Sequence, residues 1–329
     1  MNRARVVIPR KELVTPLFRY IVNRLLAALV TFLLVITLTF FLMQAVPGNP
    51  FLGDDNPRPE VAEMMMKKYG LDQPVIVQFK NYVVNLLHGD LGISIKMRWG
   101  EEVTSIIASR VPVSAQVGFI AFLLAIGIGI PMGTLAALRT GKFTDRLIIV
   151  LCAFGISVPN FVLATVLMYV LGVQFKLLPF MGLPNWQSFV MPVACLCLRP
   201  ISFISRLTRS NMLDALSQDY IKTARAKGLK EGAVLFKHAL RNALIPVVTY
   251  IGPQFVGILT GSFVIEKIFT IPGLSRYFVD SISGRDYPVI MGTTIFFGFF
   301  LIAVNFIVDM MYGVIDPRIK THKKQSYSL

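Results

Sequence analysis

The chain has 329 residues, of which 54% are hydrophobic and only 16% are charged, and its formal net charge is +15. A soluble globular protein carries about 25% charged residues, so this composition and the mean hydropathy of +0.64 exclude an ordinary soluble domain. The positive charge alone would suggest nucleic acid as a partner, but no RNA- or DNA-binding motif occurs and nucleic-acid binding is set aside.

Six stretches are long and apolar enough to cross a membrane, which takes about 20 residues. In chain order they are Phe18–Val46, Val113–Leu138, Leu147–Leu171, Phe189–Ile204, Leu244–Ile265 and Val289–Val314. The first is too long for the core of a signal peptide, so we interpret it as a retained anchor. Pro131 and Pro159 lie in the second and third spans, where membrane helices tolerate kinks, and Arg199-Pro200 interrupts the fourth. These spans predict an all-α integral membrane protein with about six transmembrane helices.

Lys and Arg are distributed unevenly between the two sides of these spans. With both termini in the cytoplasm, the cytoplasmic segments hold about twice as many Lys and Arg as the outer segments, as the positive-inside rule requires. The expected organisation is a cytoplasmic tail with the first transmembrane helix (residues 1–46), an extracytoplasmic helical segment (47–112), a transmembrane core (113–314) and a cytoplasmic tail (315–329).

The segment 47–112 is patterned as two short helices. The first is expected at Glu60–Tyr69, and the second begins after Pro74 and ends at Gly89. Apolar residues recur at helical spacing in the second helix and predict one packed face, made by Ile76, Phe79, Val83 and Leu86. The segment is interpreted as a cap or as a surface for a partner rather than as a mere spacer.

The segment 206–243 is too long for a turn between spans and too apolar for a disordered linker. Apolar spacing predicts a helix on each side of Gly228, and Gly228 is expected to take a positive φ where the first helix ends. Ala224 and Ala226 are small enough for close approach to the groove of another protein. Four cations could pair with acidic residues around such a groove or with anionic lipid, namely Lys222, Arg225, Lys227 and Lys230.

The stretch DYIKTARAKGLKEGAVLFKHALRNALIP, from Asp219 to Pro246, resembles the coupling loop of ABC importer permeases, in the peptide and nickel branch. The general pattern begins Glu-Ala-Ala, whereas Thr223 to Ala226 here reads Thr-Ala-Arg-Ala. GPQFVGILTGSFVIEKIFTIPGLSRYFVDSISGRDYPV (252–289) and NFIVDMMYGVIDPRI (305–319) resemble the oligopeptide permease B subunits, as do AVPGNPF (45–51) and KYGLDQPV…HGDLG (68–92).

This resemblance implies a fold like that of type I ABC importer permeases in a bacterial cell membrane. It also implies a non-catalytic subunit that binds no cofactor and forms a heterodimer with a second permease. ATP and Mg would bind two partner ATPase subunits, and an extracytoplasmic peptide-binding protein would deliver the cargo. The cargo implied is a peptide, in particular an oligopeptide, with dipeptides or nickel as the alternatives within the family. The residues expected to couple to the ATPases are Asp219, Tyr220, Thr223, Ala224, Arg225, Ala226, Lys227 and Gly228.

Several residues in or near the spans are candidates for the pathway or its gate. Gly252, Gly257 and Gly261 lie near helical spacing in the fifth span, either for packing within the chain or for a moving interface with the partner permease. The Pro272-Gly273 pair predicts a turn, which in the family would help to form the outer gate.

Arg199 is the one charged residue centred in a predicted span. It could line the pathway and attract a peptide carboxylate, or it could snorkel, or the span could begin later and leave it near the cytoplasmic end. Glu266 and Asp309 lie at span edges, where we expect them to be solvated.

The sequence does not indicate that this chain catalyses a reaction or binds ATP itself. No P-loop motif occurs, and His88, His238 and His322 are far apart, so neither a nucleotide site nor a hydrolase site is indicated. No metal site is indicated by the spacing of the three cysteines. A self-contained secondary transporter would carry carboxylates near the midplane and an internal repeat, and the sequence shows neither.

Overall fold

The structure is a computed structural model, and it describes residues 10–45, 70, 72–259 and 263–315. All the regular elements in this part of the chain are helices, and no strand is present among the described residues beyond one isolated bridge between Ile93 and Glu102. The predicted all-α class is therefore confirmed.

The chain divides into two compact units, and each is described by itself. The first holds α1 (Arg10–Ala45) and the part of α13 (Tyr287–Ile315) from residue 294 onward. Its two helices pack through an edge-on contact of Phe32 with Phe299, whose ring centroids are 5.7 Å apart. Arg24 and Asp309 form an ion pair at 3.0 Å, so Asp309 is not simply solvated as the sequence suggested.

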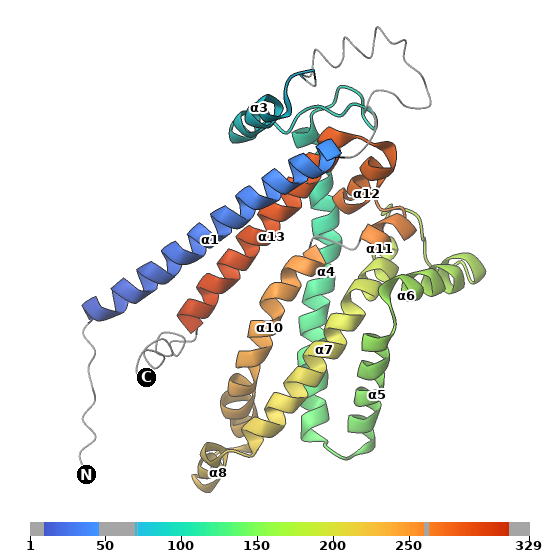
Figure 1. Cartoon of the computed structure of the whole chain (residues 1–329). Coiled ribbons are helices and arrows are strands. Elements are labelled where there is room, and N and C mark those ends of the chain that lie inside the picture. The colour runs from blue at the N-terminus through green and yellow to red at the C-terminus, as the bar shows by residue number, and fades with distance from the viewer. Residues whose placement is uncertain (1–9, 46–69, 71, 260–262, 316–329) are drawn as a thin grey trace. The chain divides into compact units, whose positions relative to one another are not determined.

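The second unit, residues 48–293, holds the other helices, and α7 (Val190–Leu216) lies at its centre. Beside α7 run α4 (Val103–Leu138), α5 (Phe143–Ser157) and α10 (Arg241–Leu259), as Figure 1 shows. Gly133 of α4 lies so close to α7 that an added Cβ would overlap the carbonyl oxygen of Ser205. Small residues of this kind let membrane helices approach closely.

Most of the predicted spans are visible as helices. Within the described part of the chain, four helical stretches are long and apolar enough to cross a membrane: Ile21–Ala45, Val103–Leu138, Trp186–Leu216 and Tyr287–Met310. A fifth crossing would combine α5 with α6 (Asn160–Leu167) and the π-helix η1 (Met168–Gln174), which are bent by 99°. The bend follows Val158-Pro159, so the expected kink is present and large.

The fifth predicted span corresponds to α10 up to Leu259, and residues 260–262 lie outside the described part of the chain. Helix α7 extends far beyond the predicted end at Ile204, because it continues to Leu216. The structure thus supports four or five of the six predicted spans by length and apolar content. The span at α10 stays a prediction.

In the predicted outer segment, the second helix is confirmed as α3 (Val75–Leu87), which follows Pro74 and ends before Gly89. The helix predicted at Glu60–Tyr69 lies outside the described residues. Phe79, Val83 and Leu86 are half-buried, but Ile76 is 73% exposed. The predicted packed face is therefore wrong at Ile76, which lies in the first turn of α3 and faces outward.

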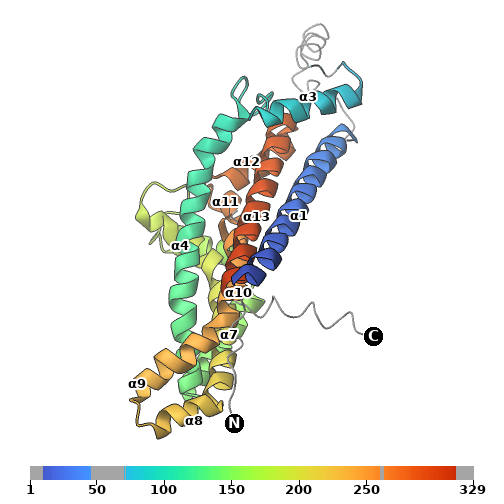
Figure 2. The ribbon, with the colours of Figure 1, turned by 90° about the vertical axis from the view of Figure 1, so that its left-hand side faces the viewer.

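The remaining helices form the two ends of the second unit. At one end lie α8 (Asp219–Ala226), α9 (Glu231–Ala233) and the π-helix η3 (Val234–Leu240), which leads into α10. At the other end lie α11 (Phe263–Ile268), α12 (Leu274–Gly284) and the 3-10 turn η2 (Trp186–Phe189). Residues 217–240, which contain α8, α9 and η3, form what we call the α8 hairpin. Figures 1 and 2 both show it projecting beyond the ends of α4 and α5.

Candidate functional site

The α8 hairpin, residues 217–240, buries one face of α8 against the chain's own membrane helices. Ile221 is fully buried and Ala224 is 6% exposed. They belong to one apolar cluster with Ala137 at the end of α4, Met212 and Ala215 of α7, Val234 and Ala239 of η3, and Ala243 of α10. The hairpin is thus packed on the ends of three long helices, and a force applied to α8 acts on all of them.

The opposite face of α8 is open. The exposed residues of the predicted coupling set are Asp219, Tyr220, Thr223, Arg225, Ala226, Lys227 and Gly228. Lys222 donates to Asp219 at 2.9 Å, and the Thr223 hydroxyl donates to the Asp219 carbonyl at 2.9 Å, which holds the first turns of the helix together. The structure therefore brings these residues to one surface.

Ala224 is the exception among the predicted coupling residues. Its side chain points into the apolar cluster, so its small size serves packing within this chain rather than close approach to a partner. Ala226 is the small residue that remains on the open face. Sequence spacing placed both alanines in one motif, but residues two apart lie on different faces of a helix.

Gly228 ends α8 in the way that the sequence predicted. Its φ is +74°, in the left-handed region, and a Cβ there would meet nothing within 4 Å. The Gly228 amide donates to the Arg225 carbonyl at 2.9 Å and the Leu229 amide donates to the Ala224 carbonyl at 3.4 Å. This pair of bonds is a Schellman motif, so glycine is required here by backbone conformation and not by space.

An ion pair closes the turn on its outer side. Arg225 donates to Glu231 from Nη2 at 2.6 Å and from Nε at 3.2 Å. The hydrogen bonds from Arg225 hold the pKa of the Glu231 carboxyl below its ordinary value. Since both side chains are exposed, the pair fixes the shape of the turn more than it stabilises the fold.

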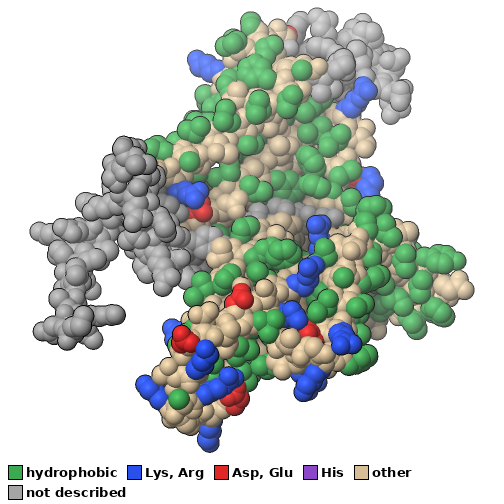
Figure 3. All heavy atoms as spheres, turned by 60° about the horizontal axis from the view of Figure 1, so that its bottom comes forward, with side chains coloured by type: hydrophobic (Ala, Val, Ile, Leu, Met, Phe, Trp, Pro, Cys, Tyr) green, Lys and Arg blue, Asp and Glu red, His purple; other side chains and the backbone are tan. Residues whose placement is uncertain are grey.

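Cations dominate the surface of this end. Lys227 and Lys230 flank the turn and are exposed, and Figure 3 shows many Lys and Arg side chains and few acidic ones at the end that it brings forward. A cationic surface of this kind complements an acidic groove or an anionic lipid surface.

An ion pair with a buried carboxylate joins α7 to the start of α5. Arg209 of α7 donates to both carboxylate oxygens of Asp145 in α5, at 2.6 and 2.9 Å, and Asp145 also accepts from the Gly141 amide. Asp145 is 2% exposed. The sequence analysis missed this pair, although a carboxylate directly after the exposed loop at the start of an apolar helix is a typical helix-start residue.

At the other end, the chain turns at Phe269-Thr270 after α11, and Pro272-Gly273, where a turn was predicted, leads directly into α12 with Gly273 extended (φ −89°, ψ 172°). Glu266 is 3% exposed, so the expectation that it would be solvated is wrong. Its carboxylate accepts from the Arg276 amide at 3.0 Å and hydrogen-bonds the Ser114 hydroxyl, which itself accepts from the Leu274 amide at 2.9 Å. A Cβ at Gly273 would overlap these groups, so this position depends on glycine.

The other pathway candidates are dispersed. Gly252 is half-buried in α10, Gly257 is exposed there, and Gly261 lies outside the described residues. Arg199 is exposed in the middle of α7, and neither end of the helix is near it in sequence.

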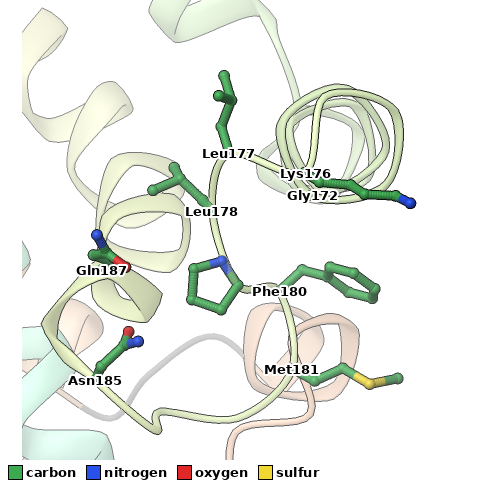
Figure 4. A pocket seen from close by; sticks show the side chains of 9 residues that line it. Gly172, Lys176, Leu177, Leu178, Phe180, Met181, Asn185 and Gln187 are labelled. Carbon is green, nitrogen blue, oxygen red and sulfur yellow. The ribbon is translucent and has the colours of Figure 1, made fainter.

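A shallow open pocket of about 530 Å³ lies in the loop between η1 and η2. Figure 4 shows that Asn185 and Gln187 lie on one side of it and that the Lys176 side chain points away. Because the Asn185 side chain accepts from the Ser188 amide as a helix cap, this pocket has little free polar chemistry for a ligand.

Comparison with known proteins matches two regions of the chain to family models. Residues 129–321 match the binding-protein-dependent transport system inner membrane component, and residues 17–118 match the N-terminal part of the same class of membrane component.

Curated relatives extend over nearly the whole chain. The dipeptide transport system permease protein of Bacillus subtilis (strain 168) is 46% identical over 93% of this chain and 99% of its own length. The oligopeptide transport system permease protein of Haemophilus influenzae is 40% identical over 92% of this chain and all of its own length.

The crystal structure of an amino acid ABC transporter superposes with a TM-score of 0.50 at 18% identity, covering 64% of this chain and 95% of that chain, which supports the fold alone. The two family models and the relatives that align with nearly the whole chain show its family. The chain belongs to the family of binding-protein-dependent transport system inner membrane components.

Proposed function

We propose that this chain is a permease subunit of an ATP-driven peptide importer. The observation that carries the proposal is the α8 hairpin, whose buried face packs on three membrane helices and whose open face is charged. Relatives named as dipeptide and oligopeptide permeases match the chain over almost its full length, which supports a peptide as cargo.

In this proposal the chain performs no bond chemistry. Two ATPase subunits hold ATP and Mg and grip the open face of α8 on the cytoplasmic side. A second permease completes the pathway as a heterodimer, and an extracytoplasmic binding protein delivers the peptide at the α12 end. Closure of the ATPases moves α8 and, through the shared apolar cluster, the ends of α4, α7 and α10.

The first test compares two glycines of the α8 hairpin, Gly228 in the turn and Gly232 in α9. Gly228→Val places a β-branched residue at φ +74°, which costs about 1–2 kcal/mol and distorts the turn. Gly232→Val is the matched control, because Gly232 does not have a positive φ and a Cβ there meets nothing within 4 Å.

The expected result, from purification in mild detergent with mass spectrometry, is that the wild type retains an ATPase and a second permease. Gly228→Val loses the ATPase but keeps the second permease, and Gly232→Val keeps both. A wild-type chain that purifies without an ATPase contradicts the proposed function. A Gly228 variant that keeps its ATPase contradicts the location of the docking surface.

Transport by the reconstituted complex then tests the cargo. ATP-dependent uptake into proteoliposomes of labelled peptides from two to six residues is the expected result, and the preferred length separates dipeptide from oligopeptide transport. Nickel uptake in place of peptide uptake would favour the alternative within the family.

One observation favours a second candidate, a self-contained secondary transporter, because the α5–α6 crossing is broken by a 99° bend. Pro159 explains this bend locally. Uptake driven by a proton gradient in proteoliposomes that contain this chain without any ATPase would establish that candidate instead.

A further inference from the structure

Helix α7 has one open face within the second unit, and that face is polar. Residues three or four apart share a side of a helix. The exposed residues at this spacing form what we call the α7 stripe: Arg199, Phe203, Arg206, Ser210 and Asp214. The intervening positions are largely buried against α4, α5 and α10. The open face of this central helix is therefore mainly charged and polar.

The ion pair of Arg209 with Asp145 marks the membrane boundary, and from it the depth of Arg199 in the membrane can be worked out. Asp145 lies two residues after the start of α5, next to the exposed loop 139–142, so Arg209 is close to the membrane boundary at the α8 end. Arg199 precedes Arg209 by ten helical residues, or about 15 Å at 1.5 Å per residue. The hydrocarbon core is about 30 Å thick, so Arg199 lies near mid-depth. This placement favours a position inside the membrane for Arg199 over one at the cytoplasmic end of its span.

A cation at that depth cannot face lipid cheaply. Among the described residues, Arg199 makes no hydrogen bond or ion pair, and Tyr250 is close enough to feel its charge. By contrast, most of the large side chains that α1 exposes within its own unit are apolar, for example Leu25, Leu29 and Leu33. The α7 stripe therefore requires water or an anionic group opposite it.

Arg199 also has an aromatic neighbourhood. Phe203, one turn further along the stripe, stacks on Tyr250 of α10 with ring centroids 4.0 Å apart. An exposed guanidinium beside an open aromatic pair fits a carboxylate that carries an apolar or aromatic side chain on the adjacent carbon. The C-terminal residue of a peptide has this structure whatever its sequence.

We propose that the α7 stripe lines the water-filled translocation pathway and that Arg199 binds the C-terminal carboxylate of the peptide in transit, an inference that rests on the proposed function. Every peptide with a free C-terminus carries this carboxylate, so one fixed cation serves cargo of varied sequence. A guanidinium offers two parallel N–H groups to a carboxylate, which a neutral side chain cannot replace.

The test measures ATP-dependent uptake by the complete importer in proteoliposomes. The probes are a labelled pentapeptide with a free C-terminus and its C-terminal amide, with a sequence for which equal binding of both by the delivery protein is measured first. We expect Arg199→Gln to lower uptake of the free acid by about tenfold or more while uptake of the amide changes less than twofold. Arg199→Lys keeps the positive charge but loses the two parallel N–H groups, so its acid uptake should fall between that of the wild type and that of Arg199→Gln. Arg139→Gln, in the loop between α4 and α5, leaves the acid-to-amide ratio unchanged.

Equal loss of both probes in Arg199→Gln would overturn the carboxylate contact, and it would indicate that Arg199 pairs with an acidic residue of the second permease. A wild-type importer that takes up neither probe would instead refute the proposed function.

A second measurement covers the case in which Arg199→Gln fails to assemble. A charged, water-soluble thiol reagent should label Arg199→Cys and should leave Leu33→Cys unlabelled, while the native cysteines are buried. Saturating peptide should slow the labelling of Arg199→Cys. Absence of labelling, or labelling that peptide does not slow, would overturn the proposal.

Discussion

The close contact of α4 with α7 makes Gly133→Ala a sharp test of the fold. A Cβ at Gly133 would overlap the backbone oxygen of Ser205 and lie 2.7 Å from the Cβ of Thr208. Alanine in a helix interior is favoured over glycine by about 1 kcal/mol, but overpacking of a tight contact costs about 1–3 kcal/mol. Because the overlapped atom is backbone, we expect the cost at the upper end and a net destabilisation of about 2 kcal/mol.

Gly127→Ala is the matched control in the same helix, since its Cβ meets nothing within 4 Å. It gains the helical preference without the overlap, so the two variants should differ by about 3 kcal/mol, or roughly 5 °C or more in Tm. The assay is thermal unfolding in detergent with a thiol-reactive dye, which reports exposure of the three buried cysteines. Equal Tm values for the two variants would refute the close approach of α4 and α7.

Three further predictions concern charged groups. Arg209→Met leaves the buried Asp145 carboxylate without its main partner and should cost about 3 kcal/mol in the same unfolding assay, with Asp145→Asn restoring part of the loss. Glu266→Leu should cost about 1–3 kcal/mol in that assay, because buried amides at the start of α12 lose their acceptor. Hydrogen bonds from Arg225 lower the pKa of Glu231, so its stabilisation of the turn is present above the ordinary pKa of a glutamate and is lost as the pH falls through the lower folded-state pKa. Hydrogen exchange of the turn amides, corrected for intrinsic rates, should show this loss in the wild type and not in Arg225→Gln.

Much of the fold could be predicted because the membrane imposes apolar runs of fixed length. The ends of the helices were harder, as α7 shows. Apolar content ends near Ile204, but the helix continues to Leu216 because one side of it stays apolar through Met212 and Ala215. Beyond the membrane a helix needs only one buried face, so a criterion based on mean hydropathy ends it too early.

Charged residues were predicted least well, since their partners are distant in sequence. Glu266 sits at the edge of an apolar run, and only the fold brings Ser114 to its carboxylate. Asp145 and Arg209 are 64 positions apart and looked like two ordinary loop charges. Gly228 was predictable for the opposite reason, because a glycine at the end of a helix is a local requirement of the backbone.

Helix α7 connects the two proposed functional surfaces directly. Its last turns pack against α8, and Arg199 lies on the same continuous helix, 17 residues before Leu216 and about 25 Å away. Pro200 follows Arg199 and lacks an amide proton, so the helix is missing one backbone hydrogen bond beside the proposed carboxylate contact. A displacement of α8 would therefore reach Arg199 through one packed element, and α7 would bend most easily where the cargo is held. In this arrangement α7 alone can couple the ATPase surface to the cargo, without a longer chain of contacts between other helices.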